Sequence, residues 1–181
     1  MCRQQQYKDR KQGIGRKGIN RQMKITILAV GKLKEKYFTS AVQEYSKRLG
    51  RYCKLEIIET ADEKTPDNAS TNEGNIIRAK EAGRLKKYIK DDAYVIALAI
   101  NGKQMPSEGF ADKLDKLGIR GISHIIFIIG GSTGLDSSIL EMADEEISFS
   151  LMTFPHQLMR VILLEQVYRA YRIINGEPYH K

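Results

Sequence analysis

Short apolar runs alternate along the chain with segments in which apolar residues recur every three or four positions. The apolar runs predict strands at 24–30, 54–59, 93–100, 123–129 and 146–150. The segments with helical spacing predict helices at 35–49, 73–89, 107–117, 137–143 and 155–174. This alternation predicts an α/β fold with a mostly parallel sheet flanked by helices.

Residues that cap or break regular structure set the expected boundaries. Gly50 and Gly176 are expected to end two of the helices, and Ser107 to cap a third. Polar residues and a proline predict a loop over 60–72, and Asn101-Gly102-Lys103 predicts a turn after the third strand.

The stretch from Ile125 to Ile174 carries the strongest indication of a ligand site. Its apolar run ends at Gly130-Gly131-Ser132-Thr133-Gly134, and the later segment 148–154 combines small hydroxyl residues with large apolar ones. The carboxyl ends of parallel strands meet at one edge of a sheet, where α/β proteins bind ligands. The pattern therefore predicts a ligand cleft at that edge.

The glycine turn at 130–134 matches no nucleotide-binding fingerprint. It lacks the Gly-Lys-Ser/Thr of a Walker A loop, and it follows the fourth strand, whereas a G-x-G-x-x-G fingerprint follows the first. Nucleotide-cofactor dehydrogenases and Rossmann-type methyltransferases are therefore disfavoured. The turn is either a tight strand–helix corner or one wall of a site. In the second case, 148–154 is suited to hold an adenine between apolar side chains; otherwise it is an ordinary strand end.

The sequence contains no recognisable arrangement of nucleophilic or acid–base residues. His124 opens a buried strand and is expected to be structural, His156 either contacts substrate or caps the last helix, and His180 lies in the tail. Without a Ser/His/Asp, Cys/His or paired-carboxylate arrangement, we expect a cofactor to bring the reactive group.

The net charge of +8 is concentrated at the amino terminus. Residues 1–22 hold seven Lys or Arg and one acidic residue, and so carry +6 of that charge. We expect 1–22 to be a disordered basic extension, either dispensable or an arm that steers RNA, and Met23 to begin the domain at 23–181.

Cysteine content and hydropathy predict the compartment. Cys2 and Cys53 form no C-x-x-C motif, and no apolar run approaches the length of a membrane span. We therefore expect a soluble cytoplasmic protein that has neither a zinc site nor a disulfide framework.

Several long motifs resemble those of a known family, the ribosomal RNA large subunit methyltransferase H family of SPOUT methyltransferases. They are MKITILAVGKLK at 23–34, IIGGSTGL at 128–135, SFSLMTFPHQLMR at 148–160, LEQVYRA at 164–170 and YHK at 179–181. The resemblance covers 23–181, and the basic segment 1–22 departs from it.

The resemblance implies a SPOUT-type α/β fold whose C-terminal part forms a trefoil knot, an exception to the rule that chains are unknotted. It implies a homodimer that uses S-adenosyl-L-methionine, without a metal, to methylate N3 of a pseudouridine in the 23S rRNA of the assembled ribosome. The cofactor-binding residues that it implies are Leu98, Gly130, Phe149, Ser150, Leu151, Met152, Thr153 and Phe154. Our candidates for substrate positioning and proton handling are His156, Arg160, Tyr179, His180 and Lys181.

Two other functions remain open at the level of sequence. The chain would suit a non-catalytic RNA- or ribosome-binding protein that keeps the fold but not the reaction. It would also suit a phosphate-binding α/β enzyme that uses the glycine turn as an anion site.

Overall fold

The computed structural model describes residues 22–66, 68 and 70–179. The predicted extension 1–22 therefore lies almost wholly outside the described residues. The regular elements are β1 (Lys24–Val30), α2 (Lys36–Leu49), β2 (Lys54–Thr60), α3 (Thr71–Leu85), η2 (Lys86–Tyr88), β3 (Tyr94–Gln104), α4 (Ser107–Ile119), β4 (His124–Ile129), α5 (Ser137–Leu140), β5 (Glu145–Ser148) and α6 (His156–Ile174).

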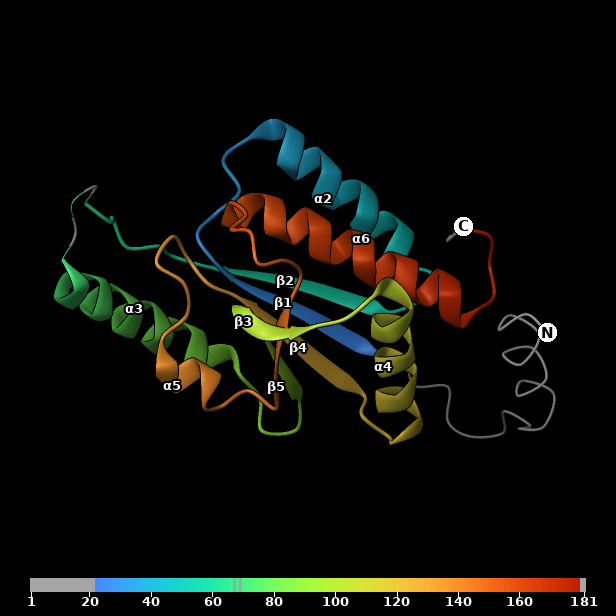
Figure 1. The fold of residues 1–181 in the computed structure, drawn as a ribbon. Coiled ribbons are helices and arrows are strands. Elements are labelled where there is room, and N and C mark those ends of the chain that lie inside the picture. The colour runs from blue at the N-terminus through green and yellow to red at the C-terminus, as the bar shows by residue number, and fades with distance from the viewer. Residues whose placement is uncertain (1–21, 67, 69, 180–181) are drawn as a thin grey trace.

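All five strands form one parallel sheet in the order β2-β1-β4-β3-β5. Every residue of β4 is buried, because helices cover both faces of the sheet. Helices α2, α4 and α6 pack on one face, and α3 and α5 lie on the other (Figure 1). The predicted fold class is confirmed.

Each face of the sheet has its own apolar core. The larger core includes Phe110 and Leu117 of α4 together with Leu163 and Val167 of α6. The smaller core lies under α3 and α5. Helix α6 contacts both α2 and α4, so deep burial accounts for much of its apolar surface.

The turn predicted at 101–103 is wrong, because β3 continues through it to Gln104. Ile147 of β5 pairs with both Leu98 and Lys103, so residues 98–104 bend around β5. A Cβ at Gly102 would lie 2.6 Å from the Ile147 carbonyl carbon, and only glycine allows this approach. The predicted trefoil knot stays a prediction.

Capping interactions explain the shifted start of one helix and correct the role predicted for Ser107. Helix α3 begins at Thr71, earlier than predicted, because Ser70 and Glu73 form a reciprocal capping box. Ser107 does not cap α4; it is the first helical residue, and its hydroxyl donates to Gln166 Oε1 over 2.8 Å. Gly50 ends α2 with right-handed dihedral angles. Across the described residues, no helix is both long and apolar enough to cross a membrane.

Candidate functional site

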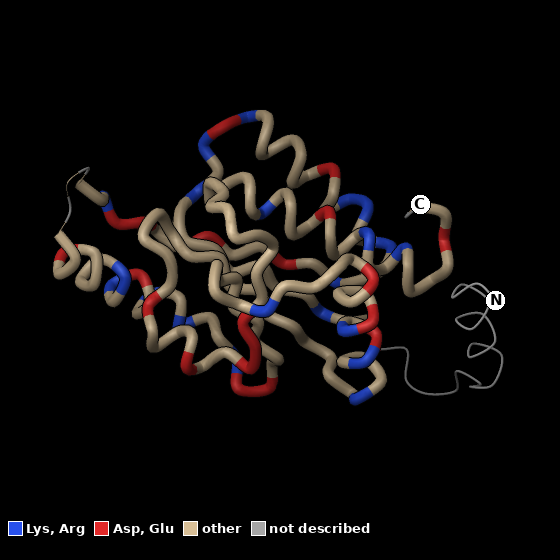
Figure 2. Tube along the Cα trace, viewed as in Figure 1, with Lys and Arg blue, Asp and Glu red and all other residues tan. Residues whose placement is uncertain are grey.

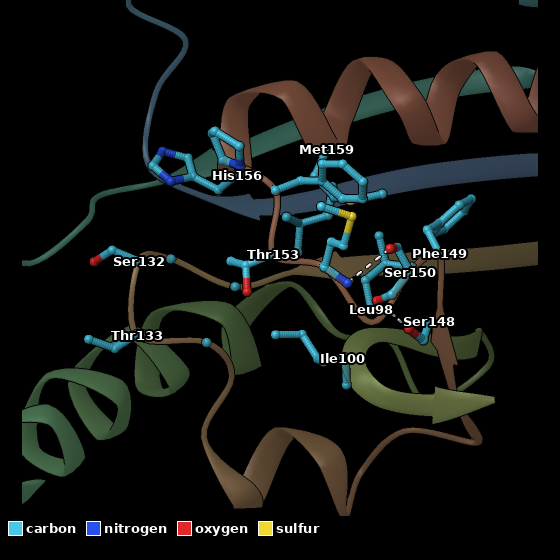
Figure 3. Close-up of a pocket in the computed structure, with 18 of the residues that line it drawn as sticks. Leu98, Ile100, Ser132, Thr133, Ser148, Phe149, Ser150, Thr153, His156 and Met159 are labelled. Atoms are coloured by element: carbon cyan, nitrogen blue, oxygen red, sulfur yellow. Dashed lines mark hydrogen bonds between the residues drawn. The ribbon is translucent and has the colours of Figure 1, made fainter. Parts of the chain in front are cut away.

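A cavity of about 670 Å³ opens at the carboxyl edge of the sheet, where the sequence predicts a cleft. Its lining comes from the middle of β3, the ends of β4 and β5, the glycine turn, the segment after β5 and the start of α6. In Figure 3 the side chains of Ser132 and Thr133 point away from Thr153 and Met159, so the turn contributes mainly its backbone to the cavity wall. Sequence positions some sixty residues apart thus meet around one space.

The glycine turn closes tightly on itself. A Cβ on Gly130 would lie 2.8 Å from the carbonyl carbon of Gly134, and Gly134 itself has a positive φ of 83°. The Gly134 amide donates to the Gly131 carbonyl oxygen over 3.2 Å. Any side chain at Gly130 would force this wall of the cavity to shift.

Helix α3 and the segment before it hold the glycine turn from outside the cavity. Arg78 donates to the Thr133 carbonyl oxygen over 3.2 Å, and the hydroxyls of Thr65 and Ser132 are 3.1 Å apart. The Glu81 carboxyl, only 3% exposed, packs against Gly131, where a Cβ would lie 2.9 Å from Oε2. Burial raises the pKa of Glu81, although one backbone amide donates to its carboxyl.

The segment after β5 is shaped by the hydroxyl residues that the sequence singled out. Ser148 donates to the Ser150 carbonyl oxygen over 2.9 Å, and the Met152 amide donates to Ser150 Oγ over 2.9 Å. The Phe149 ring meets Phe110 of α4 edge-on at 6.1 Å, which anchors the segment to the larger core. The loop thereby presents its backbone and side chains to the cavity.

Seven of the eight predicted cofactor residues line the cavity. The exception is Leu151, whose side chain is 77% exposed and does not contribute to the lining. Sequence reasoning missed other lining residues, including Ile100 and Met159. Met159 follows His156 by three positions, so helical spacing would have found it. Nothing in the sequence pattern marks Ile100, because it depends on how β3 bends.

Among the predicted catalytic residues that the structure describes, only His156 lines the cavity. Its imidazole packs over Gly31, where a Cβ would lie 3.1 Å from Nε2. Burial lowers the pKa of His156, and the positive charge of Arg160 lowers it further. The neutral imidazole is therefore favoured, and it can accept a proton.

Arg160 is buried behind the cavity and does not line it. Its guanidinium pairs with Glu59 at 2.5 Å and donates to the carbonyl oxygens of Val30 and Gly31 over 2.8 and 2.7 Å. It thus fixes the end of β1 against the start of α6. This placement makes Arg160 a positioning residue.

Tyr179 lies at the other end of α6 from the cavity. Its ring meets Tyr168 at 5.0 Å, and the Arg169 guanidinium carbon lies 4.9 Å from its centre. Arg169 is thirteen positions beyond His156, or roughly 20 Å along a helix. The remaining two candidates, His180 and Lys181, lie outside the described residues.

The cavity wall is chemically simple. It combines apolar side chains with hydroxyls, backbone groups and one imidazole, and none of its lining residues is charged. Thr133 Oγ1 is buried and has no hydrogen-bond partner among the described residues. No cluster of three potential metal ligands occurs in the described part of the chain, and the buried His124 is bonded to Thr26 Oγ1, as its expected structural role requires.

Comparison with known proteins gives the family. A family described as "Predicted SPOUT methyltransferase" matches residues 23–180. The chain belongs to the SPOUT methyltransferase family. Within this family, it is 65% identical over 159 residues to the ribosomal RNA large subunit methyltransferase H of Bifidobacterium adolescentis. It is 61% and 58% identical to the proteins of that name from Clostridium kluyveri and Clostridium beijerinckii.

Each of these alignments covers 88% of this chain and the whole of the SPOUT relative. The chain is therefore a member of the ribosomal RNA large subunit methyltransferase H group. A probable methylase family protein from Haemophilus influenzae superposes with a TM-score of 0.49 at 11% identity, over 87% of this chain and 70% of that one.

Proposed function

We propose that the protein is an S-adenosyl-L-methionine-dependent methyltransferase that modifies N3 of pseudouridine 1915 in the 23S rRNA of the assembled ribosome. The observation that carries this proposal is the match of the family over 23–180 together with a cavity formed by that family's motifs. We include a cytoplasmic location in the proposal, because the proposed substrate is the ribosome.

The cavity fits the proposed methyl donor in size and chemistry. Its volume of about 670 Å³ lies within the usual range for small-molecule sites. Apolar side chains such as Leu98 and Phe154 suit an adenine ring. A Cβ at Gly130 would collide with the Gly134 backbone, so the glycine is needed for the shape of this wall of the cavity. When bound, S-adenosyl-L-methionine supplies an electrophilic methyl group on a sulfonium.

The residues around the cavity serve to position the reactants and exclude water. Methylation at N3 would require the base to give up its N3 proton to a group of the protein. We assign that proton to His156, because its neutral imidazole lines the cavity. Arg160 holds Gly31 and the start of α6 in place behind this imidazole.

In the proposal, the tail residues Tyr179, His180 and Lys181 serve the cavity of a second copy of the chain. Tyr179 packs roughly 20 Å along α6 from His156, and two further residues span at most about 7 Å. We therefore include the homodimer in the proposal, with the tail of one subunit completing the site of its partner.

Two measurements test the proposed function. Calorimetry should detect S-adenosyl-L-methionine binding to the wild-type protein, and binding should be lost in Gly130→Leu without loss of folded structure. Mass mapping of 23S rRNA from unmethylated ribosomes should then show one added methyl group at the pseudouridine. A wild-type protein that binds no donor, or a Gly130→Leu variant that binds normally, contradicts the proposal.

A further inference from the structure

The loop between β1 and α2 lies directly beside the cavity. Its first residue, Gly31, packs under the His156 imidazole that lines the cavity wall. Farther along the loop, the Lys34 amide donates to Gln157 Oε1 over 2.9 Å. The loop therefore forms the rim of the cavity on the side of α6.

Hydrogen bonds from residues of β2 and α6 hold this rim in place. Arg160 donates to the Gly31 carbonyl oxygen over 2.7 Å, and the Leu33 amide donates to Glu59 Oε1 over 3.1 Å. With the bond to Gln157, three side chains from β2 and α6 fix three points of one short loop. A loop fixed in this way presents its outward side chains in a constant arrangement and loses little entropy on binding.

Three lysines on this rim carry free positive charge. Lys32, Lys34 and Lys36 are exposed, and none forms an ion pair within the described part of the chain. Figure 2 shows basic segments where the chain enters α2. The charge of Lys34 contributes to the lowered pKa of His156, which places that charge near the cavity. Glu35 is the only acidic residue among them.

The arginines at the other end of the molecule differ from these lysines. Arg48, Arg51 and Arg172 each form an ion pair with a carboxylate and lie over a tyrosine ring. Their positive charges are already paired with carboxylates of the same chain. The rim lysines therefore form a basic surface that is both unpaired and next to the cavity.

An exposed aromatic ring completes this surface. Tyr37 follows Lys36 directly, and 64% of its surface is accessible to solvent. Its ring lies 4.4 Å from that of Phe38, which supports it from one side. Lysines interleaved with an accessible aromatic ring are typical of surfaces that bind single-stranded nucleic acid, because they meet its phosphates and its bases.

We propose that Lys32, Lys34, Lys36 and Tyr37 form a docking rim for the single-stranded RNA that flanks the target nucleotide. The inference rests on the proposed function and deepens it. The lysines bind phosphates, and Tyr37 stacks on an adjacent base, while the target base enters the cavity. A second copy of the chain is the weaker candidate for this surface, because lysine is depleted from protein–protein interfaces.

The test compares the rim with a matched surface on the same protein. The rim variant is Lys32→Ala/Lys34→Ala/Lys36→Ala, and the control is Lys86→Ala/Lys87→Ala/Lys90→Ala. All six lysines are exposed, so both variants lose the same charge. The control lysines precede β3, at the edge of the sheet opposite the cavity. Tyr88→Ala is the control for Tyr37→Ala, because Tyr88 is also an exposed tyrosine, with 42% of its surface accessible.

Binding of unmethylated ribosomes and the KM for methylation are measured at several salt concentrations, using full-length chains. In the rim variant, the slope of log affinity against log salt should be shallower by about 2, at about 0.7 for each lost phosphate contact. Tyr37→Ala should weaken binding about tenfold with a slope close to that of the wild type. Both controls should behave as the wild type, and calorimetry should show unchanged donor affinity in all variants.

Two results would overturn this inference. One is a rim variant that keeps the wild-type affinity and salt slope. The other is a rim variant with a different oligomeric state, which would assign the surface to a second copy. Failure of the wild-type protein to bind the methyl donor or to methylate would instead refute the proposed function. In that case, ribosome binding that still depends on the rim lysines would support the docking rim independently.

Discussion

The contact between Glu81 and Gly131 joins a titratable group to the wall of the cavity. The carboxyl occupies the space where a side chain on residue 131 would lie, and one of its oxygens has no partner among the described residues. The glycine is therefore required because the carboxyl is there. The protonation of a residue outside the cavity thus bears on the shape of the turn that lines it.

This contact predicts a pH dependence of stability. Burial raises the pKa of Glu81 in the folded state, and the charges of Asp62 and Glu63 act in the same direction, while that of Arg84 opposes them. The folded protein thus holds a proton that the unfolded chain has released above about pH 4.3. The contribution of Glu81 to the free energy of unfolding is complete below that pH, and it is lost as the pH rises through the pKa of the folded state.

Glu81→Gln should remove this dependence, because the amide stays neutral. Urea unfolding at about pH 5 and about pH 8 should show that the variant gains stability relative to wild type as the pH rises, by about 1.4 kcal/mol per unit of pKa shift. Glu63→Gln is the control: the pKa of Glu63 is lowered, chiefly by the bond from Arg84, so its carboxyl is ionised in both states above about pH 5 and the variant should keep a constant difference from wild type between the two pH values. A constant difference between Glu81→Gln and wild type would contradict the prediction.

At the scale of elements, local pattern was sufficient for most of the fold. The sequence predicts the positions of all five strands, the glycine turn and the 148–154 segment, because each is determined by residues that are adjacent in the chain. The bend of β3 could not be predicted, since Asn101-Gly102-Lys103 has the composition of a turn and its pairing partner Ile147 lies more than forty positions away. Ile100 lines the cavity for the same nonlocal reason. Arg160 follows the 148–154 segment closely in sequence and therefore looks like a site residue. Only its contacts with Glu59 and Val30 show that it is a buried residue that positions β1 and α6.

The close approach of β3 to β5 makes Gly102 a sensitive position. In Gly102→Ala, the new Cβ would meet backbone atoms of Glu146 and Ile147 at 2.6–2.8 Å, and backbone cannot move aside as a side chain can. We expect the variant to lose about 3 kcal/mol of unfolding free energy and to bind the methyl donor more weakly, because β5 leads into the 148–154 segment. Chemical denaturation and calorimetry measure the two effects.

Gly83 provides the matched control for this substitution. It lies in α3, and a Cβ there would meet no atom within 4 Å. Gly83→Ala should therefore raise the unfolding free energy by about 0.5–1 kcal/mol, the usual gain of alanine over glycine in a helix. Equal effects of the two substitutions would show that β3 does not wrap closely around β5.

At the scale of the whole molecule, the proposed reaction depends on two separated regions of the chain. The cavity lies at the carboxyl edge of the sheet, whereas Tyr179 packs beside Tyr168 toward the far end of α6. Tyr179 in this position does not line the cavity of its own subunit. In a homodimer with two-fold symmetry, each tail can instead serve the cavity of the partner.

Mixing two inactive variants tests this arrangement. One variant carries Gly130→Leu and keeps its tail; the other carries Tyr179→Ala/His180→Ala/Lys181→Ala and keeps its cavity. In a mixed dimer, the intact tail can complete the intact cavity of its partner, which gives one working site out of two. Random exchange of subunits places half of the dimers in this mixed form, so methylation should recover to roughly a quarter of the wild-type rate. If each tail serves its own cavity, or if the tail takes no part, the mixture shows no gain over the sum of its two components.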